Sequence, residues 1–417
     1  MNIEEYLIGL RRANTDDAPT ELMRLCLFDW AVCAWAGRGE PVAKALRDLA
    51  SHDGPACVVG GGQTSATMAA LVNGTTGHAL DYDDTHFDHI GHTSAVIMPA
   101  VLALAQDQGQ LAMADVLAAA VTGSEAAVRV GLWLGRDHYQ IGFHQTATAG
   151  AIGAAVGCAR LLGLDSDQTA NAIGLAATGA SGLKGQFGTM GKPLNAGLAA
   201  RCGVESALWA QAGLTSDRSG VTQLGATHHG QANAKAFDMT EPWKIARISH
   251  KFHACCHGLH AMLEALRGVT DPVDSVQITT HPRWMTVCNK PAPTTGLGVK
   301  FSYAMTAAMA LSGRDTGDIS AFSDETAQDP ALVALRDRVS VTADDTLSEM
   351  QSRVTLHMPD GSRQQRFHDL AAPLSLDERA TRLRGKACSV LGNEAADAFW
   401  AAAQQDDAAP LLAVLRG

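Results

Sequence analysis

The sequence lacks the features of a nucleic-acid-binding or membrane-spanning protein. Its 417 residues carry a net charge of −11, whereas a surface that binds nucleic acid phosphates needs a basic patch. It contains no run of 18 apolar residues that would predict a transmembrane helix. The first residues also lack the apolar stretch of a signal peptide. We therefore expect no nucleic acid partner, no membrane partner and a cytoplasmic location.

Aromatic residues and spaced cysteine pairs are also scarce. Aromatic residues make up 5% of the sequence, although 46% of it is hydrophobic. Small apolar side chains therefore predominate, and they predict helices that approach one another closely. The nine cysteines include no CxxC pair, so we expect reduced thiols, most of them buried in apolar helices.

The length and the patterning of the sequence predict two domains. A chain of 417 residues exceeds the ~250–300 residues at which a single core stops growing. Residues 1–267 and about 381–417 are predicted to form a helical domain, because their apolar residues recur at helical spacing. Residues at about 268–380 are predicted to form a smaller α+β domain. Within it, the segment RVTLHMPDGSRQQRF (353–367) is typical of a hairpin with a Pro-Asp-Gly turn.

Two local signals in the helical part concern helix ends and helix packing. Asp165 and Gln168 have the spacing of a capping box. Gly150, Gly153 and Gly157 lie within two turns of one predicted helix, and each weakens a helix by about 1 kcal/mol relative to Ala. We interpret these glycines as a face that packs closely against another helix.

The segment LDYDDTHFDHIGHTS (80–94) contains four aspartates and three histidines. On a continuous helix His86 and His89 would share a face and could bind zinc with a carboxylate, but a glycine interrupts the run. A polar loop without chemistry is the second interpretation. We favour a metal-free site, because His92 precedes Thr93-Ser94, the candidate N-caps of an apolar helix. There the ring and the free backbone N–H groups can face an anion together.

Two further predicted helix starts carry a basic side chain. The segment ASGLKGQFGTMGKPLNAG (179–197) is not a P-loop, because Gln186 and Pro193 stand where that motif requires Gly and Ser or Thr. It presents Lys192 at a helix start, where a cation is unfavourable for the helix dipole and therefore indicates a bound anion. His144 likewise directly precedes a glycine-rich helix.

The segment HKFHACCHGLHAMLEAL (250–266) is the last with concentrated chemistry. Cys255-Cys256, His257 and His260 could ligate a metal, but adjacent cysteines are a weak signal compared with CxxC spacing. Lys251 precedes the predicted helix and could present a second cation. Helix starts with histidine or lysine, together with one carboxylate-rich segment, are a suitable set for binding a small polycarboxylate and moving protons.

At these residues the sequence resembles the MmgE/PrpD family. The resemblance extends over essentially the whole chain and is carried by blocks in the family's order: LVNGTTGHALDYDDTH, HTSAVIMPAVLAL, GFHQTATAGAIGAA, FGTMGKPLNAGLAARCGV, KFHACCHGLHA and TTGLGVKFSYAMTAAMAL. It implies a large all-helical domain, a smaller α+β lid domain with the site in the cleft between them, a homodimer, and catalysis without a metal or other cofactor.

The resemblance also assigns site residues. Those that match the family's decarboxylase and dehydratase members are Asp81, Thr85, His92, His144, Lys192 and Lys251. Cys256 stands where the decarboxylases carry a histidine. Tyr303 lies two positions before Met305, where a tyrosine of the family would fall. We count both Cys256 and Tyr303 as candidate substrate contacts.

The residues and the resemblance together lead to a hypothesis about the reaction. We expect Lys192 and Lys251 to bind substrate carboxylates, and His92 and His144 to transfer protons. Asp81 and Thr85 would orient a histidine or a substrate hydroxyl. Dehydration of a di- or tricarboxylate, as in 2-methylcitrate dehydratase, is the first choice. Epimerisation of an iminodisuccinate-like dicarboxylate, decarboxylation of cis-aconitate and carboxylate binding without catalysis are the alternatives.

Overall fold

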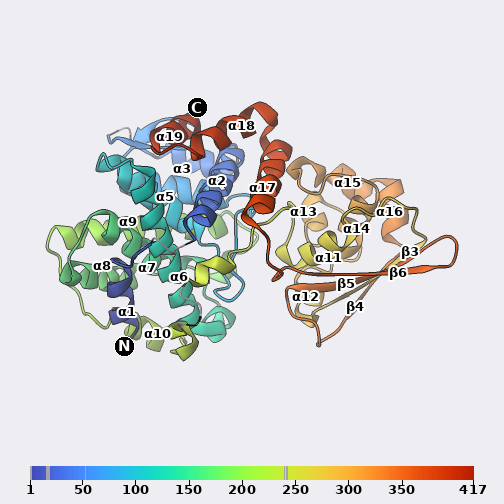
Figure 1. Ribbon diagram of the computed structural model, residues 1–417, viewed down its shortest axis with the longest axis horizontal. Helices are drawn as coiled ribbons and strands as arrows, with labels where there is room; N and C mark the ends of the chain where they lie inside the picture. Colours follow the sequence, from blue (N-terminus) through green and yellow to red (C-terminus); the bar gives the residue numbers. More distant parts are fainter. Residues whose placement is uncertain (1, 16–18, 52, 239, 241–242) are drawn as a thin grey trace. The chain divides into compact units, whose positions relative to one another are not determined.

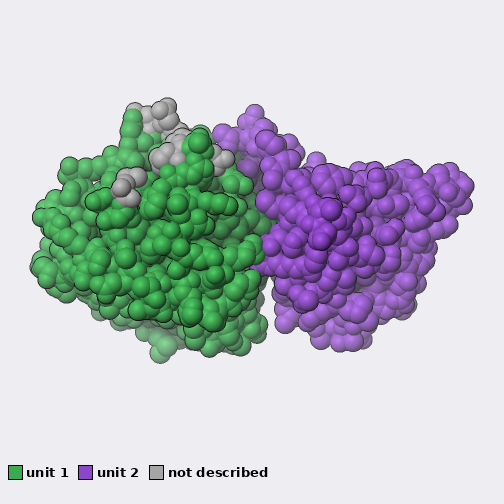
Figure 2. Space-filling model, turned by 90° about the horizontal axis from the view of Figure 1, so that it is seen from below, with its two compact units in different colours: residues 1–250, 394–417 green, residues 251–393 purple. Residues whose placement is uncertain are grey.

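The computed structural model describes residues 2–15, 19–51, 53–238, 240 and 243–417. The chain divides into two compact units, Met1–His250 with Glu394–Gly417, and Lys251–Asn393 (Figure 1; Figure 2 shows each unit in its own colour). The prediction of a mostly helical protein with a smaller α+β part is confirmed.

In its described residues, the first unit consists of helices, their connecting loops and one small antiparallel pair, β1 (Ala56–Cys57) and β2 (Gln63–Thr64). Its α-helices are α1 (Ile3–Leu10), α2 (Thr20–Gly37), α3 (Pro41–Asp48), α4 (Ala66–His78), α5 (Ser94–Asp107), α6 (Met113–Ile141), α7 (Gln145–Leu161), α8 (Ser166–Gly179), α9 (Gly191–Gln211), α10 (Gly220–Thr227), α18 (Asn393–Ala403) and α19 (Ala409–Arg416). Short 3-10 turns are η1 (Lys184–Gln186), η2 (Ala234–Phe237) and η3 (Lys244–Arg247).

Helix α7 is the centre of this unit. Nearly all of its residues are buried, and it packs against α5, α6, α8 and α9 (Figure 1). Its small residues permit this, as predicted: a Cβ added to Gly153 would lie 2.5 Å from the backbone oxygen of Gly123 in α6, and one added to Gly157 would lie 2.9 Å from that of Ala119. The glycines lower the intrinsic stability of the helix, but they permit close contact between helices.

Helix α6 has the length and hydropathy to cross a membrane, but 89% of its apolar window is buried within the structure. This is the behaviour of a core helix that other helices surround.

The second unit contains one four-stranded sheet in the order β4-β3-β5-β6. Its strands are β3 (Ser275–Thr280), β4 (Val339–Ala343), β5 (Gln351–His357) and β6 (Arg363–Asp369). Strands β3 and β4 are parallel, and the other neighbours are antiparallel. Its helices are η4 (His257–Leu259), α11 (His260–Leu266), α12 (Pro282–Val287), α13 (Gly296–Val299), α14 (Tyr303–Leu311), η5 (Ile319–Ala321), α15 (Asp324–Gln328), α16 (Pro330–Arg336) and α17 (Leu376–Leu391).

The predicted hairpin is confirmed as β5 and β6. Val354 and Leu356 of β5 are fully buried, as are Val276 and Ile278 of β3, and Gly361 takes up the positive φ of 83° in the turn. Helix α11 packs against β5 and β6. Buried and half-buried side chains alternate along β5, so one face of the sheet is covered by helix α11.

The second unit begins before residue 268 and ends after residue 380. Helix α11 belongs to it because that helix covers the sheet. Helix α17 belongs to it because Arg382 bonds to Glu264, and the Ser389 hydroxyl donates to Asp315 at 2.7 Å. Helical periodicity in the sequence does not reveal such tertiary partners. The change from helical to strand patterning in the sequence therefore does not coincide with the boundaries of the unit.

Other local predictions have mixed outcomes. The capping box of Asp165 and Gln168 is confirmed, with both hydrogen bonds present. Thr93 occupies the N-cap position of α5, but its side chain makes no capping bond to the described residues. The cysteines are thiols: six are buried, whereas Cys202, Cys256 and Cys388 are half-buried.

Candidate functional site

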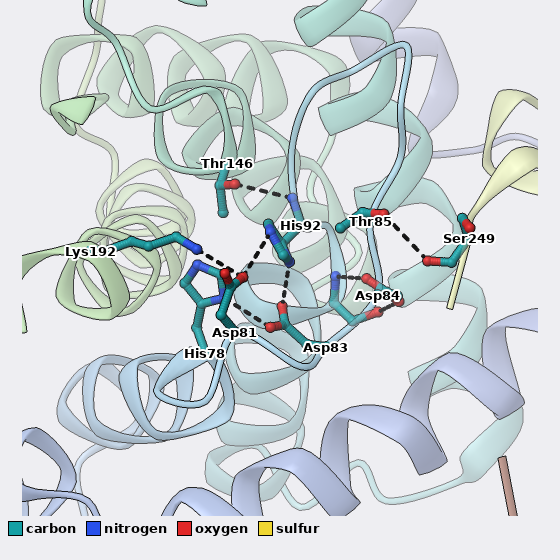
Figure 3. A network of polar contacts seen from close by, with 10 residues as sticks. His78, Asp81, Asp83, Asp84, Thr85, His92, Thr146, Lys192 and Ser249 are labelled. Carbon is teal, nitrogen blue, oxygen red and sulfur yellow. Dashed lines mark hydrogen bonds and ion pairs between the residues drawn. The ribbon is translucent and has the colours of Figure 1, made fainter. Parts of the chain in front are cut away.

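Four helix ends meet in the first unit and carry most of the predicted site. His78 is the last residue of α4, His92 lies just before α5, His144 caps α7, and Lys192 is in the first turn of α9. Helix α4 packs against α5 and α9, and α7 packs against the same two helices. The bundle therefore holds these side chains near one another (Figure 3).

Asp83 is the centre of the polar network. Its carboxylate is fully buried and accepts hydrogen bonds from Nδ1 of His78 at 2.9 Å and from Nδ1 of His92 at 3.0 Å. Burial by itself raises the pKa of Asp83, but the two neighbouring imidazoles more than offset this and bring the pKa well below its usual value. Asp83 is therefore a permanently charged group that fixes two histidines.

Asp81 lies at the more open side of the same network. Its backbone has a φ of 53°, in the left-handed region that is uncommon for residues other than glycine. Its carboxylate contacts the Lys192 Nζ at 2.8 Å and the His92 Nε2 at 3.4 Å, and 40% of its side chain is exposed. The anion that we expected beside Lys192 is thus supplied here by Asp81.

His144 is held differently from His92. Nδ2 of Asn195 donates to the Leu183 carbonyl and to Nδ1 of His144, each at 3.3 Å. Because Nδ1 of His144 accepts, its proton resides on Nε2. Burial, followed by the positive charge of His78 and Lys192, lowers the pKa of His144 well below the usual value. His144 is therefore a neutral imidazole that offers an Nε2–H donor.

Aromatic contacts fix the spacing of the rings. The ring of His78 lies edge-on to that of His92, with centroids 4.5 Å apart, and stacks with that of His144 at 6.0 Å. The Phe187 ring contacts His144 at 4.9 Å and lies 5.4 Å from the Lys192 ammonium. Three imidazoles and one cation thus form a continuous row.

Thr85 points away from this row. Its backbone forms two hydrogen bonds of 2.8 Å with Ser249, and its Oγ1 lies 3.5 Å from the Ser249 carbonyl (Figure 3). The adjacent Asp84 is buried and accepts from both the hydroxyl and the backbone N–H of Ser94. Burial raises the pKa of Asp84 to about 7, despite these hydrogen bonds. Thr85 anchors the segment that leads into Lys251, two positions after Ser249.

The remaining predicted residues belong to the second unit. Lys251 is buried, with 2% of its surface exposed. The backbone N–H of Cys256 donates to the Lys300 carbonyl at 2.9 Å. The Tyr303 hydroxyl donates to the Gly258 carbonyl and lies 2.8 Å from the Thr280 hydroxyl, so it is fixed within the interior of its own unit. A substrate contact by these three residues stays a prediction.

His86 and His89 do not form the zinc pair that we considered. Both ring nitrogens of His86 have partners: Nε2 donates to the Lys244 carbonyl at 2.9 Å, and Nδ1 accepts from the backbone N–H of His89 at 3.3 Å. The His89 ring packs so tightly on Gly131 that an added Cβ there would lie 1.9 Å from Nδ1. Both histidines are therefore structural.

Two groups of side chains in the described structure have a composition that could hold a metal ion. One consists of His78, Asp81, Asp83 and His92, and the other of Cys26, Asp84 and His250; within each group the ligand atoms lie within 4.8 Å of one another. In the first group the Lys192 ammonium already neutralises Asp81, so a dication would meet a neighbouring positive charge.

Sequence reasoning missed His78, Asp83 and Asn195 as parts of the site. His78 ends a helix whose spacing alone gives no sign of a polar partner, and nothing in the spacing of the four aspartates singles out Asp83. The available signal is the set HALDYD (78–83), in which a histidine ends a helix and two aspartates follow within five residues.

Comparisons with known proteins add to this geometry. Residues 1–234 match the MmgE/PrpD N-terminal domain, and residues 246–405 match the MmgE/PrpD C-terminal domain. A cis-aconitate decarboxylase of Aspergillus terreus is 31% identical over 280 residues, which cover 61% of this chain and 57% of that protein. A cis-aconitate decarboxylase of Homo sapiens is 31% identical over 157 residues, which cover 36% of this chain and 32% of that protein. The matched segments thus span less than two thirds of each relative.

Proposed function

Because the chain belongs to the MmgE/PrpD family, we propose that it is a cofactor-independent lyase that removes a proton next to a carboxylate of a small di- or tricarboxylate. One observation supports this above all. Buried Asp83 bonds to Nδ1 of His92, while Nε2 of the same ring faces the ion pair of Asp81 and Lys192. This is the arrangement of a histidine base that has a fixed tautomer and lies beside a carboxylate-binding cation.

The contacts of Lys192 suggest the class of substrate. Its ammonium already holds one carboxylate, that of Asp81, at 2.8 Å. A substrate carboxylate would bind to the same ammonium with a charge-assisted hydrogen bond. We propose that Lys251 supplies a second cation for another substrate carboxylate.

We propose that His92 acts as the base. Its Nε2 takes the proton from the carbon next to a substrate carboxylate, and the resulting imidazolium is stabilised by Asp83 at Nδ1 and by Asp81 at Nε2. General base catalysis of this kind contributes about 10²–10⁴-fold to the rate. The carbanion that forms is an enediolate, whose charge needs cations and N–H donors within reach.

His144 supplies a donor of the right kind. It is neutral, it carries its proton on Nε2, and it occupies the N-cap position of α7 without a side-chain capping bond. In dehydration the bond between the neighbouring carbon and its hydroxyl oxygen breaks. The imidazolium of His92 gives its Nε2 proton to the departing hydroxide, which leaves as water, and a carbon–carbon double bond remains. We propose that the Nε2–H of His144 donates a hydrogen bond to the enediolate or to the departing oxygen and keeps its proton.

Decarboxylation is the second candidate, and the similarity to cis-aconitate decarboxylases of Aspergillus terreus and Homo sapiens favours it. In that reaction a carbon–carbon bond to a carboxylate breaks, carbon dioxide leaves, and the remaining carbanion takes a proton. The same imidazoles would then act in the protonating direction. Dehydration is our first choice because base and donor are separate groups with opposite tautomers.

The reaction is tested by proton NMR with 2-methylcitrate, citrate, cis-aconitate and iminodisuccinate. A new vinylic signal from a hydroxy acid identifies a dehydratase, and carbon dioxide release from cis-aconitate identifies a decarboxylase. Deuterium uptake from heavy water without net conversion identifies an epimerase. If none of the four compounds shows turnover or exchange, the proposal is wrong and carboxylate binding without catalysis becomes the better account.

A further inference from the structure

We propose that Asp83 and His78 are positioning residues that hold His92 in the tautomer needed for proton transfer. This inference rests on the proposed function of His92. It adds a dedicated hydrogen-bonded pair behind the base, neither member of which reaches the substrate: Asp83 is 0% and His78 1% exposed.

The two carboxylate oxygens of Asp83 contact different histidines. Oδ1 contacts Nδ1 of His78 at 2.9 Å, and Oδ2 contacts Nδ1 of His92 at 3.0 Å. An ionised carboxylate can only accept hydrogen bonds, so both Nδ1 atoms carry hydrogen. Nε2 is then the atom of His92 that takes and releases the reacting proton, and it is the atom that faces Asp81 and Lys192.

His78 differs from His92 in what surrounds its other nitrogen. Nε2 of His78 is buried and has no hydrogen-bond partner among the described residues. His78 therefore acts on the network through its Nδ1–H, which donates to Oδ1 of Asp83. By holding Oδ1 it stops the carboxylate from rotating, and this aims Oδ2 at His92.

The ring of His78 has a second positioning effect. It lies between the proposed base and the proposed donor, edge-on to His92 at 62° and nearly parallel to His144 at 24°. Glycine at position 77 permits this end of α4 to approach its neighbours, because a Cβ there would lie 2.4 Å from the indole nitrogen of Trp30. His78 thus sets both the tautomer of His92 and the distance between the two working imidazoles.

The first test compares turnover in matched variants. Asp83→Asn removes the charged acceptor and should lower kcat by about 10²-fold or more, within the range of acid–base catalysis, while KM changes little because Lys192 remains. His78→Leu should lower kcat in the same way. His78→Asn keeps an N–H donor near the position of Nδ1 and should recover much of that loss. His86→Gln, a buried histidine of the same segment with a structural bond to Lys244, is the control.

The second test observes the tautomers directly. NMR of protein labelled with ¹⁵N-histidine, with the signals of His78 and His92 assigned from His78→Asn and His92→Gln, should show both rings protonated at Nδ1 in the wild type. Asp83→Asn should shift His92 toward a mixture of tautomers. The wild-type spectrum alone tests the inference if the Asp83 variant does not fold.

The outcomes separate the inference from the proposed function. Wild-type turnover, together with an Asp83→Asn variant of unchanged kcat and an unchanged His92 tautomer, overturns the positioning role and leaves the function standing. A His92 ring protonated only at Nε2 in the wild type overturns it as well. Absence of wild-type turnover on all four compounds overturns the proposed function, and the positioning role falls with it.

Discussion

Asp81 and Asp83 are two positions apart but experience opposite surroundings. Asp83 is buried between two histidines, whereas Asp81 is partly exposed and contacts Lys192. A buried charge that is fully hydrogen-bonded is costly to disturb, while a partly exposed ion pair contributes little and exchanges readily. At the scale of residues, we therefore propose that Asp83 is the fixed part of the site and that a substrate carboxylate displaces Asp81 from Lys192.

Lys192→Met tests this division. Loss of the ammonium should lower kcat/KM by about 10²-fold or more, because both substrate binding and enediolate stabilisation depend on it. Lys184→Met is the matched control, since the Lys184 ammonium lies nearby but donates to the Tyr139 carbonyl at 2.9 Å. Steady-state kinetics on the identified substrate measure both. Near-native rates for Lys192→Met would remove this residue from the site.

His89 makes the stability of the protein depend on pH. Burial, followed by repulsion from His86 and His92, lowers its pKa to about 3. Below about pH 6.5 the imidazole of His89 is protonated in the unfolded chain but stays neutral in the folded chain. The free energy of unfolding therefore falls by about 1.4 kcal/mol per pH unit as the pH decreases below that value. His89→Asn should reduce the loss of unfolding free energy between pH 8 and pH 5 by about 2 kcal/mol.

Urea denaturation at the two pH values measures this effect. His229→Asn is the control, because His229 is exposed and its replacement should leave the pH dependence as it is. An identical pH dependence in His89→Asn and the wild type would mean that His89 is not the buried neutral group described here.

At the scale of elements, close contact between α6 and α7 determines where the helix ends meet. Residues 143–144 at the start of α7 place His144 against α4 and α9 only if α7 lies deep in the bundle. Glycines on α7 permit this position, because without a Cβ the backbone of α7 can contact the backbone of α6. The precision of the site thus depends on packing two turns away from it.

Gly153→Ala tests the contact. The new methyl group would lie 2.5 Å from the Gly123 oxygen and 2.6 Å from the Ala127 Cβ. The helices must move apart, so the free energy of unfolding should fall by about 1–3 kcal/mol, although Ala is the better helix former. Gly385→Ala in α17 is the control: its Cβ would meet no described atom within 4 Å, and stability should rise by about 0.5–1 kcal/mol. Equal effects in both variants would contradict the packing account.

The elements also show which features were predictable from the sequence. The capping box at Asp165 and the hairpin after Val354 depend on residues that are close in the chain, so the sequence pattern predicted them. The bond of Ser94 to Asp84 and the bridge from Asp83 to His78 depend on how a loop folds back. Periodicity contains no information on such loops, and the role of Ser94 as an N-cap was therefore misjudged.

At the scale of the whole molecule, the homodimer implied by the family resemblance stays a proposal. Exposed apolar side chains gather along and beside α9, where Leu198, Trp209 and Met190 are 47%, 43% and 56% exposed. A hollow of about 750 Å³ between α8 and α9 is lined in part by Leu198 and Trp209. We propose that these exposed apolar side chains belong to the dimer interface.

Leu198→Asp should therefore convert a dimer into a monomer, because a charge in an apolar interface lacks a partner. Light scattering during size-exclusion chromatography gives the mass directly. Leu49→Asp is the control, since Leu49 is 75% exposed but lies after α3. A wild-type monomer at all concentrations, or a Leu198→Asp dimer of undiminished stability, would contradict the proposed interface.

The central claim is that His92, held by Asp83, moves a proton at a carbon next to a carboxylate without a metal. The most direct measurement follows deuterium incorporation from heavy water into the substrate or product by NMR, with protein dialysed against EDTA. The account predicts incorporation at that carbon by the wild type and a rate lower by about 10²-fold or more in His92→Gln. Equal incorporation by His92→Gln, or loss of all exchange after EDTA treatment, would contradict it.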